Sequence, residues 1–167
     1  MFSTAHFKGC DIAIEAYKAA ARNVANLQLV AFGQHHPNEN LALPPGTDFH
    51  YRPAQDKIPE IYASCDAWLF SSRSEGFGLP ILEAMACRTP VIGVPTGAAP
   101  ELISRGGGVL VKPQDPIDLA RAIERLGRLP VGEWKSLSDA AYATAQANNW
   151  SASTELFEAS LLRAAGA

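Results

Sequence analysis

The residue types best suited to chemistry gather between residues 71 and 94. Two glutamates, Glu75 and Glu83, stand eight positions apart, and a glycine-rich turn, Gly76-Phe77-Gly78, follows the first of them. Glycines let the backbone approach a ligand closely, and Leu79-Pro80 then opens a helix, because proline fits a first helical turn. Amide groups at a helix N-terminus attract anions such as phosphates, and a carboxylate one turn further on can accept hydrogen bonds from hydroxyl groups.

Two apolar runs flank this turn and its helix. Residues 67–70 read as a strand before the turn, and the β-branched run at 91–94 reads as a buried strand after the helix. The unit is therefore a β-α-β crossover with its glycine turn at the carboxyl end of the first strand. Open parallel sheets bind their ligands at that end.

The rest of the chain alternates in the same way. We expect an α/β fold, a doubly wound parallel sheet with helices on both faces. Further strands are predicted at 27–32, 48–52 and 109–111, and helices at 9–24, 56–64, 116–126, 132–147 and 151–164. Helical spacing places an apolar face inward in three of these helices: Cys10, Ala13, Ile14, Tyr17, Ala20 and Val24 in the helix at 9–24, Ile117, Ala120, Ile123 and Leu126 in the helix at 116–126, and Phe157 and Leu161 in the helix at 151–164.

The N-terminal segment is the exception to this alternation. A doubly wound sheet normally begins with a strand, but residues 1–8 are too short and too polar for a complete one. We expect the first strand to be truncated or incomplete, and the chain to be a piece of a longer protein.

Composition narrows the class of protein. The chain has 167 residues, 47% of them hydrophobic, which suits one domain over residues 1–167. A net charge of −3 gives no electrostatic case for nucleic acid. The three cysteines lack metal-binding spacing and read as buried thiols in a reducing compartment, and His35-His36 lacks partners for a metal site. No apolar run reaches the ~20 residues of a membrane span, and no signal peptide is visible, so we expect a cytoplasmic protein.

The segment EGFGLPILEAMACRTPVIG resembles the signature of the glycosyl transferases group 1 (GT4-like) family of retaining GT-B enzymes. Glu75 and Glu83 fit its two glutamates, and the likeness extends to Lys8-Gly9 before the first helix and to Pro100-Glu101-Leu102-Ile103. Gly108-Val109-Leu110-Val111-Lys112-Pro113 and Tyr62-Ala63-Ser64-Cys65-Asp66-Ala67 match as well. The resemblance covers nearly the whole chain as a C-terminal donor-binding domain, with a Rossmann-like fold that forms the C-terminal half of GT-B.

This resemblance implies the roles of the site residues. Glu75 would hold hydroxyls of the transferred sugar and Lys8 would neutralise the leaving diphosphate, so both are catalytic candidates. Gly76, Phe77, Gly78, Leu79 and Glu83 would bind the nucleotide. The donor would be a UDP- or GDP-sugar, with no cofactor and no metal required. Base and sugar selectivity is expected in the loops at 48–55 and 95–99.

Two departures from the family pattern bear on activity. The family's Gly-Arg pair ahead of the lysine is replaced by Ser3-Thr4, which removes one phosphate-neutralising charge. The N-terminal acceptor domain is absent, so we expect the isolated chain to be inactive, and any peripheral membrane association would come through that missing half.

Other interpretations of the same residues remain. Glu83 could simply face solvent on the outer side of its helix, together with Pro80 and Cys87. Lys8 could likewise be an ordinary surface charge. The chain could then be a non-enzymatic α/β interaction module, or another GT-B enzyme such as a sugar-nucleotide epimerase. A Rossmann dinucleotide enzyme is disfavoured, because no GxGxxG follows a first strand.

Overall fold

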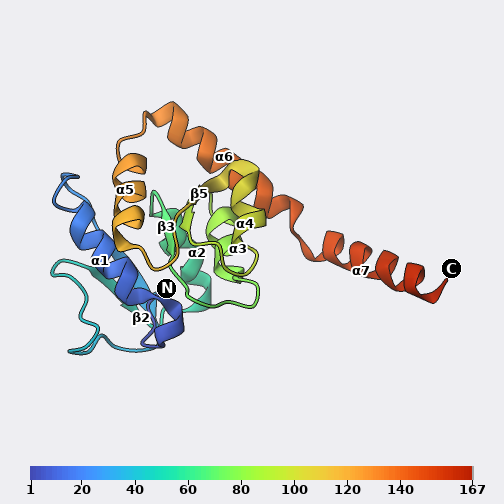
Figure 1. Ribbon diagram of the computed structural model, residues 1–167, viewed down its shortest axis with the longest axis horizontal. Helices are drawn as coiled ribbons and strands as arrows, with labels where there is room; N and C mark the ends of the chain where they lie inside the picture. Colours follow the sequence, from blue (N-terminus) through green and yellow to red (C-terminus); the bar gives the residue numbers. More distant parts are fainter. Residues whose placement is uncertain (167) are drawn as a thin grey trace.

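The computed structural model describes residues 1–166, in which strands and helices alternate through most of the chain (Figure 1). The strands are β1 (Val30–Gly33), β2 (Asp48–Tyr51), β3 (Trp68–Phe70), β4 (Val91–Gly93) and β5 (Gly108–Leu110). The helices are α1 (Cys10–Ala20), α2 (Ile58–Ala63), α3 (Leu79–Ala86), α4 (Ala99–Leu102), α5 (Pro116–Leu126), α6 (Val131–Ala147) and α7 (Trp150–Ala165), with short turns η1 (His6–Lys8), η2 (Gln55–Lys57) and η3 (Ile103–Gly107).

All strand pairs are parallel, as predicted, but they form two sheets. β1 pairs with β2, placing Val30 opposite Asp48, and a second sheet has the order β3-β4-β5. The expected first strand is reduced to one parallel bridge between Phe2 and Gly33. A single paired residue is what the short, polar N-terminal segment supports.

Helices cover both faces of the sheets, which gives the Rossmann-like layering predicted for the chain. Helices α1 and α5 pack together on one side, while α2, α3 and α6 lie on the other (Figure 1). The core between them is apolar: Ile81, Met85, Val91 and Ile92 are fully buried. This burial fixes α3, and with it the glycine turn that precedes α3.

Helix α5 begins where the sequence indicated. The Asp115 carboxylate accepts hydrogen bonds from the backbone N–H groups of Ile117 and Asp118, at 3.0 and 2.9 Å, which caps the helix. The inner face differs from the expected one, because Ile117 is exposed while Leu119 and Ala122 are buried. Helix α1 also buries Ile12 and Ala16, outside its predicted face, because it packs against α5 as well as the sheet.

The prediction that Phe157 and Leu161 face inward is wrong. Helix α7 contains no buried residue, and it extends away from the rest of the chain (Figure 1). Phe157 is 66% exposed and Leu161 is 54% exposed. Helical periodicity identifies an apolar stripe but not the surface that covers it. Within residues 1–166, no helix combines the length and hydropathy that crossing a bilayer requires.

Candidate functional site

The start of α1 is held against the carboxyl end of β3. Gly9 has φ 64°, and a Cβ there would lie 2.0 Å from the carbonyl oxygen of Ser71, so only glycine fits without a backbone shift. The Ser71 hydroxyl donates to the Gly9 carbonyl at 2.8 Å, and the Arg73 N–H donates to the Phe7 carbonyl at 2.7 Å. These contacts place Lys8 at the end of the strand that leads into the glycine turn.

Lys8 and Glu75, 67 positions apart in sequence, meet at this end of the sheet. The Lys8 Nζ lies 2.6 Å from Glu75 Oε1, and the Ser72 hydroxyl donates to the same oxygen at 3.0 Å. Their side chains are only 21% and 13% exposed, respectively, so solvent screens the pair weakly. The sequence predicted Lys8 and Glu75 as site residues but gave no sign that Ser72 would join them.

The glycine turn leaves the N-terminus of α3 accessible. Gly78 caps the helix with φ 94°, and it rests against the ring of buried Phe70. No side chain caps this terminus, Pro80 has no N–H, and the Ile81 N–H donates to the Gly78 carbonyl at 2.9 Å, which leaves the amides from Gly76 to Leu79 for a ligand. Gly76 has open space around its Cα, and Phe77 and Leu79 are 46% and 57% exposed. A ligand can therefore reach the backbone amides directly.

The loop at 95–98 packs on the glycine turn. The Ala98 N–H donates to the Phe77 carbonyl at 2.8 Å, and the Thr96 hydroxyl donates to the Ser72 carbonyl at 3.1 Å. This loop, which is part of the segment 95–99 expected to set donor selectivity, thus borders the glycine turn. Spacing along the chain did not indicate these two hydrogen bonds.

Glu83 lies on the exposed side of α3, one turn beyond its N-terminus. Its Oε2 accepts a hydrogen bond from the Tyr62 hydroxyl at 2.9 Å. Tyr62 is almost fully buried, and its backbone carbonyl accepts from the buried Thr89 hydroxyl at 2.8 Å. Burial, assisted by the Glu83 charge, raises the pKa of Tyr62, which keeps its hydroxyl a donor.

The two glutamates are held separately. Glu75 is paired with Lys8 and Ser72, whereas Glu83 is held by Tyr62. Because helical side chains lean toward the N-terminus, Glu83 leans toward the glycine turn that follows Glu75. The uncapped turn can receive an anion, and each carboxylate can accept hydrogen bonds from hydroxyl groups.

Other candidate residues have structural partners. Glu101 forms an ion pair with Arg105 at 2.7 Å on its own helical segment. The glycines at 106–108 turn into β5, and Gly107 packs against Ala141. The ring of His36 stacks on Tyr51 at 3.8 Å. In residues 1–166, no three His, Cys, Asp or Glu residues cluster as metal ligands.

The parallel strands, the helices on both faces and the glycine turn before α3 form a Rossmann-like α/β domain. Residues 3–145 match the family described as Glycosyl transferases group 1, and the chain belongs to that family. The C-terminal domain of a glycosyl transferase group 1 family protein from Francisella tularensis aligns with a TM-score of 0.73 and 25% identity, over 86% of this chain and 80% of that one.

Two further matches are with longer chains, of which this chain covers less than half. Sucrose-phosphate synthase from Thermosynechococcus elongatus aligns with a TM-score of 0.76 and 25% identity, over 96% of this chain and 44% of that one. A D-inositol 3-phosphate glycosyltransferase from Streptosporangium roseum is 37% identical over 100 residues, which cover 59% of this chain. The aligned part spans only 22% of that relative's length.

HepE from Anabaena is a solved structure in complex with UDP-glucose. It aligns with a TM-score of 0.68 and 25% identity, over 84% of this chain and 41% of that one.

Proposed function

We propose that this chain is the donor-binding half of a retaining glycosyltransferase that takes a sugar from a UDP- or GDP-type donor. The observation that carries this proposal is the contact between Lys8 and Glu75 beside an uncapped helix N-terminus. A cation and a carboxylate near backbone amides that can donate hydrogen bonds are what a sugar diphosphate requires, which supports the proposal. The solved complex of HepE with UDP-glucose supports a nucleotide-sugar as the ligand.

The diphosphate binds at the glycine turn. Amides of Gly76 to Leu79 donate to its oxygens, and the positive end of α3 adds ~0.3–1 kcal/mol, or more where water is excluded. Lys8 lies close enough to Glu75 to exchange its carboxylate partner for phosphate oxygen. Its charge then offsets the negative charge that builds on the leaving diphosphate. Ser3-Thr4 supplies no second cation, so Lys8 has that role alone at this end of the chain.

The two glutamates bind hydroxyl groups on opposite sides of the diphosphate. Glu83 accepts from the ribose hydroxyls with one carboxylate oxygen while Tyr62 holds the other. Glu75 accepts from hydroxyls of the transferred sugar, with Ser72 keeping its carboxylate in place. Each hydrogen bond to a charged group contributes roughly 1.5–3 kcal/mol.

Transfer with retention would proceed on one face of the sugar, with the departing diphosphate helping to deprotonate the acceptor. An acceptor must also be positioned and water excluded, which requires a second wall of the cleft. We therefore propose that the donor half binds nucleotide but does not turn over by itself. No resident cofactor or metal is needed in this scheme.

Titration calorimetry and NMR with UDP, GDP and their sugars test the proposal. We expect a Kd on the order of 0.1–1 mM for at least one of them, which corresponds to about 4–5.5 kcal/mol. Chemical-shift changes should fall on Gly76, Phe77 and Glu83. Absence of binding by all of these ligands at about 10 mM would contradict the proposal.

A matched pair of glutamate variants assigns the site. Glu83→Ala should weaken nucleotide binding about 10- to 100-fold, because hydrogen bonds to a charged acceptor are lost. Glu158→Ala is the control, since Glu158 is an exposed glutamate on the projecting helix α7. Equal affinities for the two variants would favour a non-enzymatic interaction module.

A further inference from the structure

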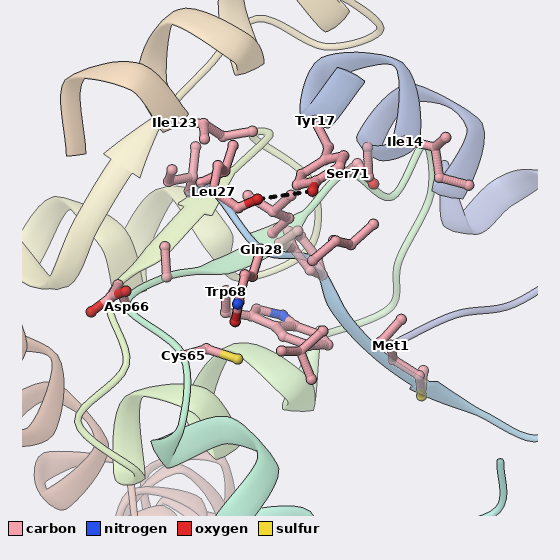
Figure 2. Close-up of a pocket in the computed structure, with 18 of the residues that line it drawn as sticks. Met1, Ile14, Tyr17, Leu27, Gln28, Cys65, Asp66, Trp68, Ser71 and Ile123 are labelled. Carbon is pink, nitrogen blue, oxygen red and sulfur yellow. Dashed lines mark hydrogen bonds between the residues drawn. The ribbon is translucent and has the colours of Figure 1, made fainter. Parts of the chain in front are cut away.

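The turn that carries Lys8 is held in place by polar contacts. Turn η1 (His6–Lys8) contains no buried residue, and no side chain caps it. Beside the turn lies Ser71, which also lines a cavity of about 400 Å³ between the two sheets (Figure 2). The Ser71 hydroxyl is 3.5 Å from the Lys8 carbonyl oxygen and donates to the Gly9 carbonyl at 2.8 Å. Hydrogen bonds to the loop after β3 therefore position Lys8.

Arg73 joins this turn to the same loop. Its backbone N–H donates to the Phe7 carbonyl at 2.7 Å, and its guanidinium Nη1 donates to the His6 carbonyl, also at 2.7 Å. The guanidinium forms a bidentate ion pair with Asp11 in the first turn of α1, at 2.8 and 2.7 Å. One side chain thus binds both the residues before Lys8 and the helix that follows it.

The Arg73 side chain lies against the protein along most of its length. It is only 17% exposed, whereas its partner Asp11 is 51% exposed. The Arg73 Nε–H is buried and has no acceptor among residues 1–166. Burial of an unpaired N–H is unfavourable, so the contacts of the two terminal nitrogens must outweigh it. A planar guanidinium can bind two acceptors in a fixed geometry, which a lysine ammonium cannot do.

We propose that Arg73 is a positioning residue, which holds Lys8 where its ammonium can meet the diphosphate of a nucleotide donor. This inference rests on the proposed function of the site that contains Lys8 and Glu75. Arg73 itself does not bind the ligand, because its guanidinium is occupied by His6 and Asp11. Its effect passes through Lys8, whose Nζ already lies 2.6 Å from Glu75. A lysine that is positioned before the ligand arrives loses less conformational freedom on binding.

Affinities for a nucleoside diphosphate and for its nucleoside test the proposal when they are compared. NMR titrations pair UDP with uridine and GDP with guanosine, because only the diphosphates can contact Lys8. We expect Arg73→Ala to weaken diphosphate binding about tenfold and nucleoside binding less than about twofold. A general loss of structure would weaken both ligands alike. Arg73→Lys keeps the charge but not the bidentate geometry, so it should recover only part of the affinity.

Arg128→Ala is the matched control. Arg128 donates to the Asn23 carbonyl at 2.9 Å and lies 4.0 Å from the Glu124 carboxylate, so it makes similar contacts beyond the opposite end of α1. This variant should bind the diphosphate and the nucleoside as the wild-type chain does.

A double variant shows whether Arg73 acts through Lys8. Once Lys8→Met has removed the ammonium, Arg73→Ala should change diphosphate affinity less than about twofold. A tenfold loss that persists without the ammonium would mean that Arg73 acts on the phosphates by itself, which would overturn the positioning role. Equal diphosphate affinities for Arg73→Ala and the wild-type chain would also overturn it, while leaving the proposed function in place.

Amide exchange in the ligand-free chain is a second measurement. Arg73→Ala should speed exchange about tenfold at Lys8 and Gly9, whose N–H groups donate within this turn, and leave the buried Val91 unchanged. Unchanged exchange at Lys8 and Gly9 would overturn the inference whether or not a nucleotide binds. If the wild-type chain binds neither UDP nor GDP but Arg73→Ala speeds exchange, the result supports the hold of Arg73 on Lys8 and contradicts the proposed function.

Discussion

The carboxyl end of β3 and the seam between β1 and β3 adjoin each other but are built differently. At the carboxyl end, Gly9 fits closely against Ser71, and Lys8, Ser72 and Glu75 form a hydrogen-bonded cluster. The seam beside it holds a cavity of about 400 Å³ bounded by two sheet edges. Side chains therefore form a hydrogen-bonded cluster where the chemistry is proposed, while a cavity lies next to it.

This difference separates the proposed binding site from the cavity. The proposed ligand contacts come from residues 8 and 75–83, which are anchored to the three-stranded sheet and its helices. Of these contacts, only that of Glu83 reaches toward β1, through Tyr62, whose ring packs against Phe32. Substitutions at the carboxyl end of β3 should therefore affect nucleotide binding more than substitutions that line the cavity.

Substitution at the start of α1 should have the largest effect. Gly9→Ala places a Cβ 2.0 Å from the Ser71 carbonyl oxygen and forces an unfavourable positive φ. We expect a loss of about 3–5 kcal/mol in the free energy of unfolding, measured by urea denaturation. Nucleotide binding should weaken as well, because Lys8 is displaced.

Gly132→Ala is the matched control for Gly9→Ala. A Cβ at Gly132 meets no atom within 4 Å, and the residue lies in α6. Alanine favours a helix by up to about 1 kcal/mol over glycine, so this variant should be slightly more stable. Similar losses in both variants would refute the close packing at Gly9.

The buried amine of Met1 should make the free energy of unfolding depend on pH. The buried Met1 amine has its pKa lowered from 8.0 to about 5, chiefly by burial and with Lys8 also lowering it, while Cys10, Cys65 and Glu83 act in the opposite direction. The unfolded chain therefore binds more protons between these values. The free energy of unfolding should fall from pH 8 to pH 5, by up to about 1.4 kcal/mol per pH unit.

Urea denaturation at pH 5.5, 6.5 and 7.5 measures this slope. An Nα-acetylated chain provides the comparison, because its N-terminus no longer titrates, and its stability should change less over the same range. Parallel profiles for the two chains would mean that the amine is solvated in both the folded and the unfolded states.

Removal of the Tyr62 hydroxyl should affect binding more than stability. Tyr62→Phe retains the ring packing against Phe32 and Trp68 but releases Glu83 Oε2. Loss of one hydrogen bond of about 1 kcal/mol predicts roughly fivefold weaker nucleotide binding. Calorimetry on Tyr62→Phe, Glu83→Ala and the double variant separates positioning from packing: the tyrosine change should have no further effect once Glu83 is absent.

The smallest effect is expected at the exposed pair beside the site. Arg73 donates to both Asp11 oxygens, at 2.8 and 2.7 Å, and this lowers the pKa of Asp11. Asp11 is 51% exposed, so Asp11→Asn should cost only about 0.5 kcal/mol near neutral pH. The contribution is lost as pH falls below the ordinary value of 3.8. A loss above about 2 kcal/mol would mean that this ion pair contributes more to the free energy of unfolding than an exposed ion pair does.

Local signals in the sequence predicted most of the elements. The β-branched run at 91–94, the glycine turn before Pro80 and the helix at 116–126 each correspond to observed structure. These predictions succeeded because the determinants lie within a few residues of one another. The inward face predicted for α7 was wrong because helical periodicity is also a local signal, and it does not show whether a distant surface covers the apolar stripe.

Sequence by itself determined that the chain is a parallel α/β domain, that it belongs to the glycosyl transferases group 1 family, and that Lys8, Glu75 and Glu83 were the residues to locate. Tertiary structure decided that Lys8 pairs with Glu75, that Tyr62 holds Glu83, and that a cavity divides the sheet. Periodicity and turn chemistry are encoded by neighbouring residues. Contacts across 21 or 67 positions depend on how strands align, and no local pattern specifies that alignment.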